Sequence, residues 1–451
     1  MVWAAIWMQV ISLAKNKQTS ARALALATLE EVFYQGAYSN IALNKQLKDS
    51  HLSQADKALT TELVYGTVAR KLTLEWQLAH FIEDRNKLDP RIYTLLLLSL
   101  YQLAYLEKIP DHALVHEAVS LAKSVSTKGA AGLVNAVLRR ILREGLPNPE
   151  TIKRKNKRYS ILYSLPVWLV AKILEEFGEN RALAIFESLF VRNKASFRVT
   201  DLARKAEIAD ILGAEESQLA PSALVKQQGH LAGTSLFQEG AITIQDESSQ
   251  LVAPTLDLKG EETILDTCAA PGGKTTHLAS YLTTGQVIAL DLYDHKLDLI
   301  KANAERLHVA DRIKTRKLDA SQVHEAFPAD SFDKILVDAP CSGIGLIRRK
   351  PDIKYNKENA DFTSLQTIQL EILASVCQTL RKGGIITYST CTIFSEENFQ
   401  VVEQFLASHP HFEQVPLEHK QQEIMKQGCL LVTPEQFGSD GFFISQFRRI
   451  S

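Results

Sequence analysis

The sequence has few cysteines and no long apolar run. Its 451 residues include five cysteines, none of which lies before Cys268 and no two of which form a Cys-x-x-Cys pair. An odd number of cysteines without Cys-x-x-Cys spacing argues against a disulfide framework and against a structural zinc site. This use of cysteine is expected of a protein in a reducing cytoplasm. No apolar stretch reaches the roughly 18 residues that a membrane helix needs. We therefore expect neither a bound metal nor a membrane partner.

A strong charge of one sign is absent from the whole chain but not from its parts. The formal net charge is −1. Up to Arg158 there are 22 lysines and arginines against 14 acidic residues, a balance of +8, and the remainder has 29 against 38, a balance of −9. A basic module on an acidic body predicts a polyanionic partner such as nucleic acid, and the alternative is a solvated helical surface.

The amino-terminal third has the apolar spacing of helices. Residues 1–18 begin with a short apolar stretch that no basic residue precedes, which predicts an extension rather than a signal peptide. Residues 19–145 predict an all-helical module, with helical periodicity in 21–33, 59–81, 90–106, 114–125 and 133–142. Residues 146–163 predict a linker with a basic run: Lys153, Arg154, Lys155, Lys157 and Arg158. Such a run is either solvated or a contact for phosphates.

The rest of the chain divides into two parts. Residues 164–257 predict a small α+β region, with a strand at 195–200 and a helix at 207–212. In residues 258–451, helical stretches separate most of the short apolar runs at 263–266, 286–291, 313–318, 332–338 and 384–389. This alternation predicts an α/β fold with a doubly wound, Rossmann-like parallel sheet. Ligands of such sheets bind at the carboxyl ends of the strands.

A loop of small residues follows the first predicted strand of this sheet. It consists of Cys268, Ala269, Ala270, Pro271, Gly272, Gly273 and Lys274. A Walker A phosphate loop would need glycine where Cys268 stands, and the Gly-x-Gly-x-x-Gly pattern of nicotinamide sites is absent. A third option is a methyltransferase loop, whose cofactor, S-adenosyl-L-methionine, carries a sulfonium and a ribose but no phosphate. It needs close backbone and carboxylates rather than an anion cradle.

Acidic residues end the next predicted strands. Asp291 lies 19 residues after Gly272, where a carboxylate is placed to bind ribose hydroxyls. Asp319 ends the third strand and could meet the adenine amino group. Taken singly, each aspartate could equally be a turn or helix-capping residue. The series of carboxylates at strand ends is the stronger indication of a ligand site.

Two cysteines also follow strand ends. Cys341 comes after the fourth strand in Asp-Ala-Pro-Cys-Ser-Gly, and Cys391 comes after the fifth in Tyr-Ser-Thr-Cys-Thr. Cys377 and Cys429 fall inside helical and strand patterns and are expected to be buried filler. A thiol at the ligand edge is reactive only if its pKa is lowered, which the sequence does not show.

Four stretches together resemble the RNA (cytosine-5)-methyltransferase family, also called the Nol1/Nop2/Sun family. They are LDTCAAPGGKTTHLA, LVDAPCSGIGLIRRKPDIK, YSTCTIFSEEN and DGFFISQFRR. The stretch AAGLVNAVLRR and the helices before it resemble a NusB-like RNA-binding domain. Nearly the whole chain is thus similar to the bacterial 16S ribosomal RNA enzymes of the Fmu/Sun subfamily. Thr200 and Tyr355 depart from the family pattern, and both are expected on the substrate side.

The resemblance implies a function and a cofactor. The chain would be an S-adenosyl-L-methionine-dependent enzyme that methylates carbon 5 of a cytosine in 16S ribosomal RNA, with residues 164–257 contributing to RNA recognition. A monomer is expected. The residues from Cys268 to Lys274, with Asp291 and Asp319, would hold the cofactor, and Asp338 would lie near its methionine part.

The resemblance also implies which residues carry the chemistry. A thiolate that adds at carbon 6 makes carbon 5 nucleophilic, and a carboxyl group near N3 offsets the developing charge. Cys391 would be this nucleophile, Cys341 would aid breakdown of the adduct, and Asp338 would contact the base. The chemistry alone does not choose between the two cysteines.

Two other functions remain open from the residues. One is a P-loop ATPase with an RNA-binding module, since Gly273, Lys274 and Thr275 fit part of a Walker A motif. The other is a non-catalytic RNA-binding factor of the NusB type, which would leave the two strand-end cysteines without a purpose. Arg348, Arg349 and Lys350 follow the Pro-Cys loop and are expected either to contact RNA phosphates or to form a solvated turn.

Overall fold

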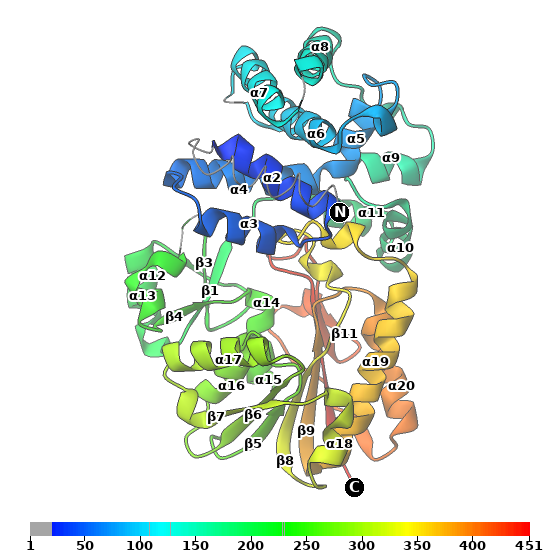
Figure 1. Ribbon diagram of the computed structural model, residues 1–451. Helices are drawn as coiled ribbons and strands as arrows, with labels where there is room; N and C mark the ends of the chain where they lie inside the picture. Colours follow the sequence, from blue (N-terminus) through cyan, green and yellow to red (C-terminus); the bar gives the residue numbers. More distant parts are fainter. Residues whose placement is uncertain (1–19, 108, 127, 228, 230) are drawn as a thin grey trace. The chain divides into compact units, whose positions relative to one another are not determined.

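A computed structural model describes residues 20–107, 109–126, 128–227, 229 and 231–451, so the predicted extension 1–18 lies outside the described residues. The chain forms two compact units (Figure 1). The first comprises the chain up to Glu175 together with Lys350–Asn356, and the second comprises Glu176–Arg349 and Lys357–Ser451. Among the described residues, none of the helices has the length and apolar character needed to cross a bilayer.

The first unit is helical. Its helices are α2 (Ala21–Tyr34), α3 (Ser39–Lys48), α4 (Gln54–Ala69), α5 (Lys71–Leu78), α6 (Pro90–Tyr105), α7 (Asp111–Val125), α8 (Lys128–Glu144) and α9 (Lys155–Leu162), and α10 (Val167–Phe177) ends it. The five predicted helical stretches are confirmed. Helix α3 was not predicted, because it buries only Ser39, Ala42 and Leu43. The division of the predicted stretch 59–81 into two helices at Arg70 was not predicted either, because no proline or glycine marks it.

Helix α6 is the centre of the first unit. Every residue from 92 to 102 is buried, so this helix is enclosed on all sides, and α2, α4, α5, α7 and α8 pack against it. Asp89 caps its amino end by accepting from the N–H of Arg91 at 2.8 Å, and Pro90 suits the first turn. Local sequence therefore sets where the helix begins, and burial sets its composition.

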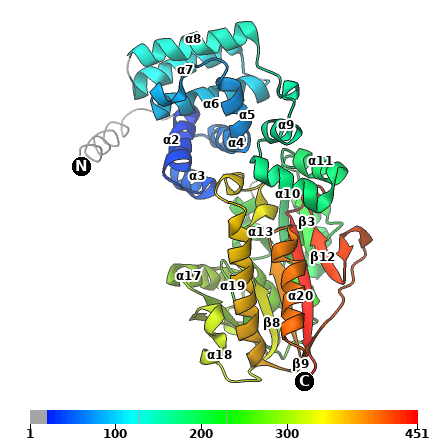
Figure 2. The same cartoon turned by 90° about the vertical axis from the view of Figure 1, so that its right-hand side faces the viewer.

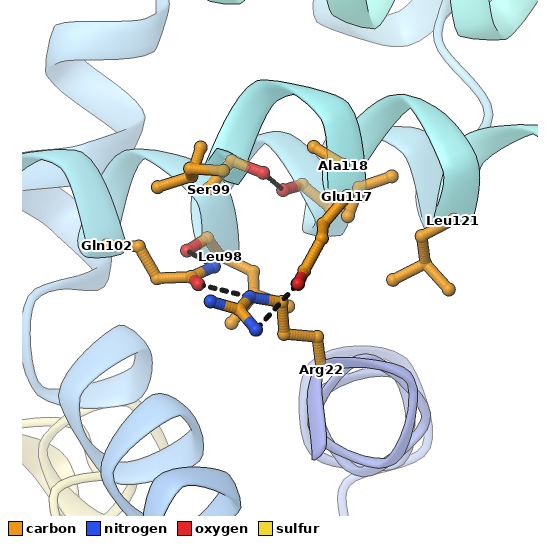
Figure 3. Close-up of a pocket in the computed structure, with 9 residues that line it drawn as sticks. Arg22, Leu98, Ser99, Gln102, Glu117, Ala118 and Leu121 are labelled. Atoms are coloured by element: carbon orange, nitrogen blue, oxygen red, sulfur yellow. Dashed lines mark hydrogen bonds and ion pairs between the residues drawn. The ribbon is translucent and has the colours of Figure 1, made fainter. Parts of the chain in front are cut away.

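A partly buried arginine links three of these helices. Arg22 of α2 donates to Gln102 Oε1 of α6 at 2.7 Å and pairs with Glu117 of α7 at 2.6 Å. Figure 3 shows these side chains at a small pocket that is otherwise lined by Ser99 and aliphatic residues of α6 and α7. Because both partners of the guanidinium are protein groups, this pocket belongs to the packing of the helices.

The segment Lys350–Asn356 is part of the first unit although it is distant in sequence. Asp352 accepts from the Ser39 hydroxyl, and Lys354 Nζ donates to the carbonyl of Ala69 at 2.7 Å. The Tyr355 hydroxyl donates to the carbonyl of Val68 at 3.0 Å and contacts Ser164 Oγ at 3.0 Å. The Tyr355 hydroxyl is therefore bound within the helical unit, and the expectation that Tyr355 lies on the substrate side stays a prediction.

The stretch predicted as a basic linker contains a helix. Residues 155–162 form α9, and its Ile161 carbonyl accepts from the Thr73 hydroxyl of α5 at 2.5 Å. Lys153, Arg154 and Lys157 are exposed. The run is thus anchored on one side and presents cationic groups to solvent on the other.

The second unit contains a small antiparallel sheet in the strand order β2-β3-β1-β4. Its elements are α11 (Glu179–Ser188), β1 (Ala195–Val199), α12 (Lys205–Leu212), β2 (Glu215–Glu216), β3 (Ala223–Lys226) and β4 (Ile242–Ile244). The predicted strand at 195–200 and helix at 207–212 are confirmed. Thr200 directly follows β1, and its hydroxyl donates to the carbonyl of Gly240 at 2.8 Å.

The larger sheet has the parallel core that the sequence predicted. The strands are β5 (Thr263–Asp266), β6 (Gln286–Asp291), β7 (Ile313–Lys317), β8 (Phe332–Asp338), β9 (Leu380–Thr390), β10 (Phe412–Gln414), β11 (Met425–Lys426), β12 (Cys429–Val432) and β13 (Phe442–Arg449). The parallel part has the order β7-β6-β5-β8-β9, and β13, β12 and β11 extend it antiparallel. Strand β9 starts earlier than predicted because residues 381–383 are exposed and carry no apolar signal.

Helices cover both faces of this sheet (Figures 1 and 2). The helices α15 (Val252–Thr255), α16 (Gly273–Ser280) and α17 (Asp294–Arg306) lie on one face, and α18 (Val323–Ala326), α19 (Ala360–Val376) and α20 (Phe399–Ser408) lie on the other. Neighbouring residues of β5 belong to different hydrophobic cores: Ile264 lies in the core that contains Leu278 of α16, and Leu265 lies in the core that contains Val376 of α19. The strand order reverses between β5 and β8, which is where such sheets bind ligands.

Candidate active site

The loop of small residues connects β5 to α16. Gly272 has φ +100°, and a Cβ there would lie 3.1 Å from the Ile300 Cα of α17, so a side chain would strain this turn. At Gly273, the first residue of α16, a Cβ would meet no atom within 4 Å. The Ala269 N–H donates to the carbonyl of Leu290 on β6 at 2.9 Å. The loop is therefore held to the sheet, while its last glycine borders open space at the start of a helix.

Asp266, the last residue of β5, is a buried carboxyl that was not among the predicted site residues. Its Oδ2 accepts from the Thr275 hydroxyl at 2.7 Å, and burial raises the pKa of Asp266 to about 7. The position of Asp266 at a strand end is the sequence feature that could have identified it as a site residue. Burial also raises the pKa of Cys268 to about 12, so this thiol stays protonated and is unsuited to act as a nucleophile.

Asp291 and Asp319 lie at the carboxyl edge of the sheet, at the ends of neighbouring strands. Asp291 is 8% exposed, and its Oδ1 accepts from the N–H of Tyr293 at 3.3 Å and lies 3.5 Å from Lys296 Nζ. Asp319 Oδ1 accepts from the Ser321 N–H at 2.9 Å and caps the following turn. Asp291 thus stabilises a turn and Asp319 caps one, which are the local roles considered above, and these local contacts of each residue fall on Oδ1.

Lys274 forms an ion pair with Asp338 at the end of β8. The distance from Lys274 Nζ to Asp338 Oδ2 is 2.8 Å, and the Ser389 hydroxyl of β9 donates to Asp338 Oδ1 at 2.8 Å. Burial disfavours the charge of Lys274, but the Asp338 carboxylate outweighs burial and raises the pKa of Lys274. A Walker A lysine must reach phosphates, whereas this ammonium is neutralised by a carboxylate. The geometry therefore disfavours the P-loop hypothesis.

The structure brings the two strand-end cysteines together. Cys341 Sγ and Cys391 Sγ are 3.1 Å apart, and the Cys391 N–H donates to Cys341 Sγ at 3.3 Å. The hydrogen bond with Cys391, burial and the nearby Glu397 raise the pKa of Cys341 well above its ordinary value. Two thiols in contact do not both ionise easily, so the arrangement favours one thiolate beside one thiol. Cys377 and Cys429 are buried, as predicted.

The two arginines after the Pro-Cys loop, Arg348 and Arg349, are held by other groups of the protein. The Arg348 guanidinium donates to the carbonyls of Gly438 at 2.5 Å and Ser439 at 2.6 Å, and this side chain is buried. Arg349 pairs with Asp440 at 2.8 Å and also with Asp246. The prediction for these two arginines is wrong, because carbonyl or carboxylate groups within the second unit bind each guanidinium group.

Comparisons with known proteins agree with this arrangement. Residues 253–448 match the family model described as 16S rRNA methyltransferase RsmB/F, and residues 19–143 match the NusB family. A relative from Bacillus subtilis, described as probable ribosomal RNA small subunit methyltransferase B, is 43% identical over 96% of this chain and 99% of its own length.

Solved structures share the fold. The crystal structure of PH0851 has a TM-score of 0.81 and 25% identity, and the match covers 96% of this chain and 99% of that one. The structure of NSun6 from Pyrococcus horikoshii with SFG has a TM-score of 0.56 and 20% identity, covering 64% of this chain and all of that one. At that identity the second likeness supports the fold alone.

Proposed function

This chain belongs to the RsmB/F family of S-adenosyl-L-methionine-dependent 16S rRNA methyltransferases, and from this premise we propose that it methylates carbon 5 of a cytosine in 16S ribosomal RNA through a covalent adduct with Cys391. The observation that carries the proposal is the contact of the two thiols at 3.1 Å, at the ends of adjacent strands and beside the Lys274–Asp338 pair. A methyltransferase acting on a nucleophilic oxygen or amine would have no use for two paired thiols.

The chemistry explains why thiols are needed. Carbon 5 of cytosine is too electron-poor to accept a methyl group directly. When the Cys391 thiolate adds to carbon 6, a sulfur–carbon bond forms and the electrons of the 5,6 double bond make carbon 5 nucleophilic. After methylation a base removes the carbon 5 proton, the 5,6 double bond returns, and the sulfur–carbon bond breaks to release the thiolate. We assign to Cys341 the assistance of this last step.

We assign to Asp338 the contact with the target base. Asp338 is held between the Lys274 ammonium and the Ser389 hydroxyl, so its position is fixed before the base arrives. A carboxyl group that shares a proton with N3 offsets the charge that builds up during thiol addition. The base must leave its stack to reach this edge of the sheet, which favours an exposed rRNA loop as the target.

The residues present fit S-adenosyl-L-methionine, which supplies an electrophilic methyl group when bound. The loop from Cys268 to Lys274 offers backbone at the amino end of α16 and open space at Gly273. Asp291 and Asp319 would bind the ribose hydroxyls and the adenine amino group, respectively. Asp266 and Asp338 add carboxyl groups at the same edge, as a cationic sulfonium compound requires, and Lys274 is neutralised by Asp338.

Asp291→Ala tests the cofactor site and the reaction together. Loss of a charge-assisted hydrogen bond to ribose should weaken cofactor affinity by roughly 1.5–3 kcal/mol, or about 10- to 150-fold. Calorimetry with S-adenosyl-L-methionine measures the affinity of each variant. For the reaction, 16S rRNA from a strain that lacks this enzyme is treated with the protein, and bisulfite sequencing detects the new 5-methylcytosine. The matched control is Asp298→Ala, an exposed carboxylate of α17 that should bind like wild type. The proposal would be contradicted if the wild-type protein bound magnesium–ATP instead of S-adenosyl-L-methionine, or if it left the rRNA unmethylated.

We propose that the basic run at the amino end of α9 contacts RNA phosphates. Neutralising Lys153, Arg154 and Lys157 together should weaken RNA binding and lower the slope of log K against log salt by about 2–3, because fewer counterions are released. The control triple, Lys259, Lys314 and Lys382, neutralises exposed lysines near the amino ends of β5, β7 and β9, away from the thiols. Equal salt slopes for both triples, measured by fluorescence anisotropy, would remove the run from the RNA interface.

A further inference from the structure

Two adjacent side chains under the cysteine loops are not used by the chemistry above. Glu397 and Asn398 are fully buried and lie between β9 and α20. A buried carboxyl and a buried amide each cost desolvation free energy unless hydrogen bonds compensate. Their partners are therefore informative about what they do.

Glu397 holds the loop that carries Cys341. Its Oε1 accepts from the N–H of Ser342, the residue after Cys341, at 2.7 Å. The same oxygen accepts from Gln369 Nε2 at 3.2 Å, and this amide also donates to the carbonyl of Pro340, the residue before Cys341, at 2.9 Å. The backbone on both sides of Cys341 is thus fixed by one carboxyl and its amide partner.

Asn398 holds the turn that carries Cys391 in the same manner. Its Oδ1 accepts from the Thr390 hydroxyl at 2.5 Å, and its Nδ2 donates to the carbonyl of Thr392 at 3.1 Å. These residues directly precede and follow Cys391. A bridge from the Ser342 hydroxyl to the Thr392 hydroxyl at 3.0 Å joins the two loops.

Resting on the proposed function, we propose that Glu397 and Asn398 are positioning residues with separate tasks. Glu397 holds the loop of Cys341 so that this thiol is positioned for release of the adduct. Asn398 holds the turn of Cys391 so that this thiol is positioned for attack on the base. A misplacement of a reacting group by about 1 Å can cost roughly 100-fold in rate, so a loosened loop should affect the step of its own thiol. The two variants should then fail at different points of one reaction.

Glu397→Ala should let the covalent methylated adduct accumulate while Cys341 is still present. We expect kcat to fall by about 10-fold or more and KM to fall with it, because slowed release lets the covalent species accumulate, so kcat/KM should change little. A protein–RNA band should persist in a denaturing gel. Glu397→Gln, which keeps an oxygen acceptor for the Ser342 N–H, should restore much of the turnover. If Glu397→Ala does not fold, Gln369→Ala removes the donor to Pro340 and carries the same expectation.

Asn398→Ala should lower the rate by a similar factor without any adduct, because attack itself is slowed. Val402→Ala in α20 is the matched control: it trims a buried side chain of the adjacent core, and it should lower thermal stability without changing the adduct fraction. An adduct with Asn398→Ala, or no more adduct with Glu397→Ala than with Val402→Ala, overturns the inference. Cys341→Ala on the same gel distinguishes failure of this inference from failure of the proposed function. If Cys341→Ala does not trap RNA, the proposed function itself is contradicted.

Discussion

Cys391→Ala is expected to abolish methyl transfer, and Cys341→Ala is expected to leave a covalent protein–RNA complex that survives denaturation. Without the Cys391 thiol no bond to carbon 6 can form, so carbon 5 is never activated. Without Cys341 the attack and methylation still proceed, but release of the adduct slows. The contact of the two sulfurs at 3.1 Å allows both to reach the same base, so the partition of roles is a chemical question that this pair of variants answers.

The measurement is a denaturing gel with labelled 16S rRNA fragments. The shifted band of Cys341→Ala should require both RNA and S-adenosyl-L-methionine, since the species that accumulates carries the methyl group. The double variant should show no band, because trapping requires attack first. Cys377→Ala, which changes a buried cysteine away from the site, serves as the control and should behave like wild type apart from stability. A band with Cys391→Ala and none with Cys341→Ala would assign the nucleophile to Cys341.

Arg349→Met is expected to produce a large loss of stability. The Arg349 guanidinium lies between Asp440, at 2.8 Å, and Asp246, and both carboxylates are buried. Among the described residues, Arg349 is the cation that forms ion pairs with both carboxylates. Without it, Asp246 keeps only its hydrogen bonds with neutral donors of Ser248, Ser439 and Asp440, and Asp440 loses its ion pair. Breaking a buried pair in this way costs about 3–5 kcal/mol.

The denaturant midpoint of the second unit measures this loss. Arg448→Met provides the control, because Arg448 pairs with Glu413 at 3.6 Å and both side chains are about half exposed, so its removal should cost less than about 1 kcal/mol. If Arg349 contacted RNA phosphates instead, Arg349→Met would weaken RNA binding and leave the midpoint close to that of Arg448→Met. That outcome would restore the function expected from the sequence.

Local pattern determined the secondary structure of the catalytic sheet. The apolar runs that became β5, β6 and β8 have the bounds that the sequence predicted, because a strand that is buried on both faces needs a nearly continuous apolar stretch in its middle. The loop from Cys268 to Lys274 was recognisable because close backbone approach restricts it to small residues. Features without a local signal were missed, such as α3 and the exposed start of β9.

Pairing between distant segments decided the rest. Asp338 and Ser389 are neighbours only because β8 pairs in register with β9, and this register places Cys341 against Cys391 across 50 residues of sequence. A basic run looks the same in sequence whether its partner is a phosphate or a buried carboxylate, so only the fold showed that Arg349 is held by Asp246. Glu397 and Asn398 carried no distinguishing pattern, because their importance lies in the backbone groups that the fold brings to them. Sequence fixes which groups are available, and the tertiary structure fixes their partners because hydrogen bonds and ion pairs form between neighbours in space.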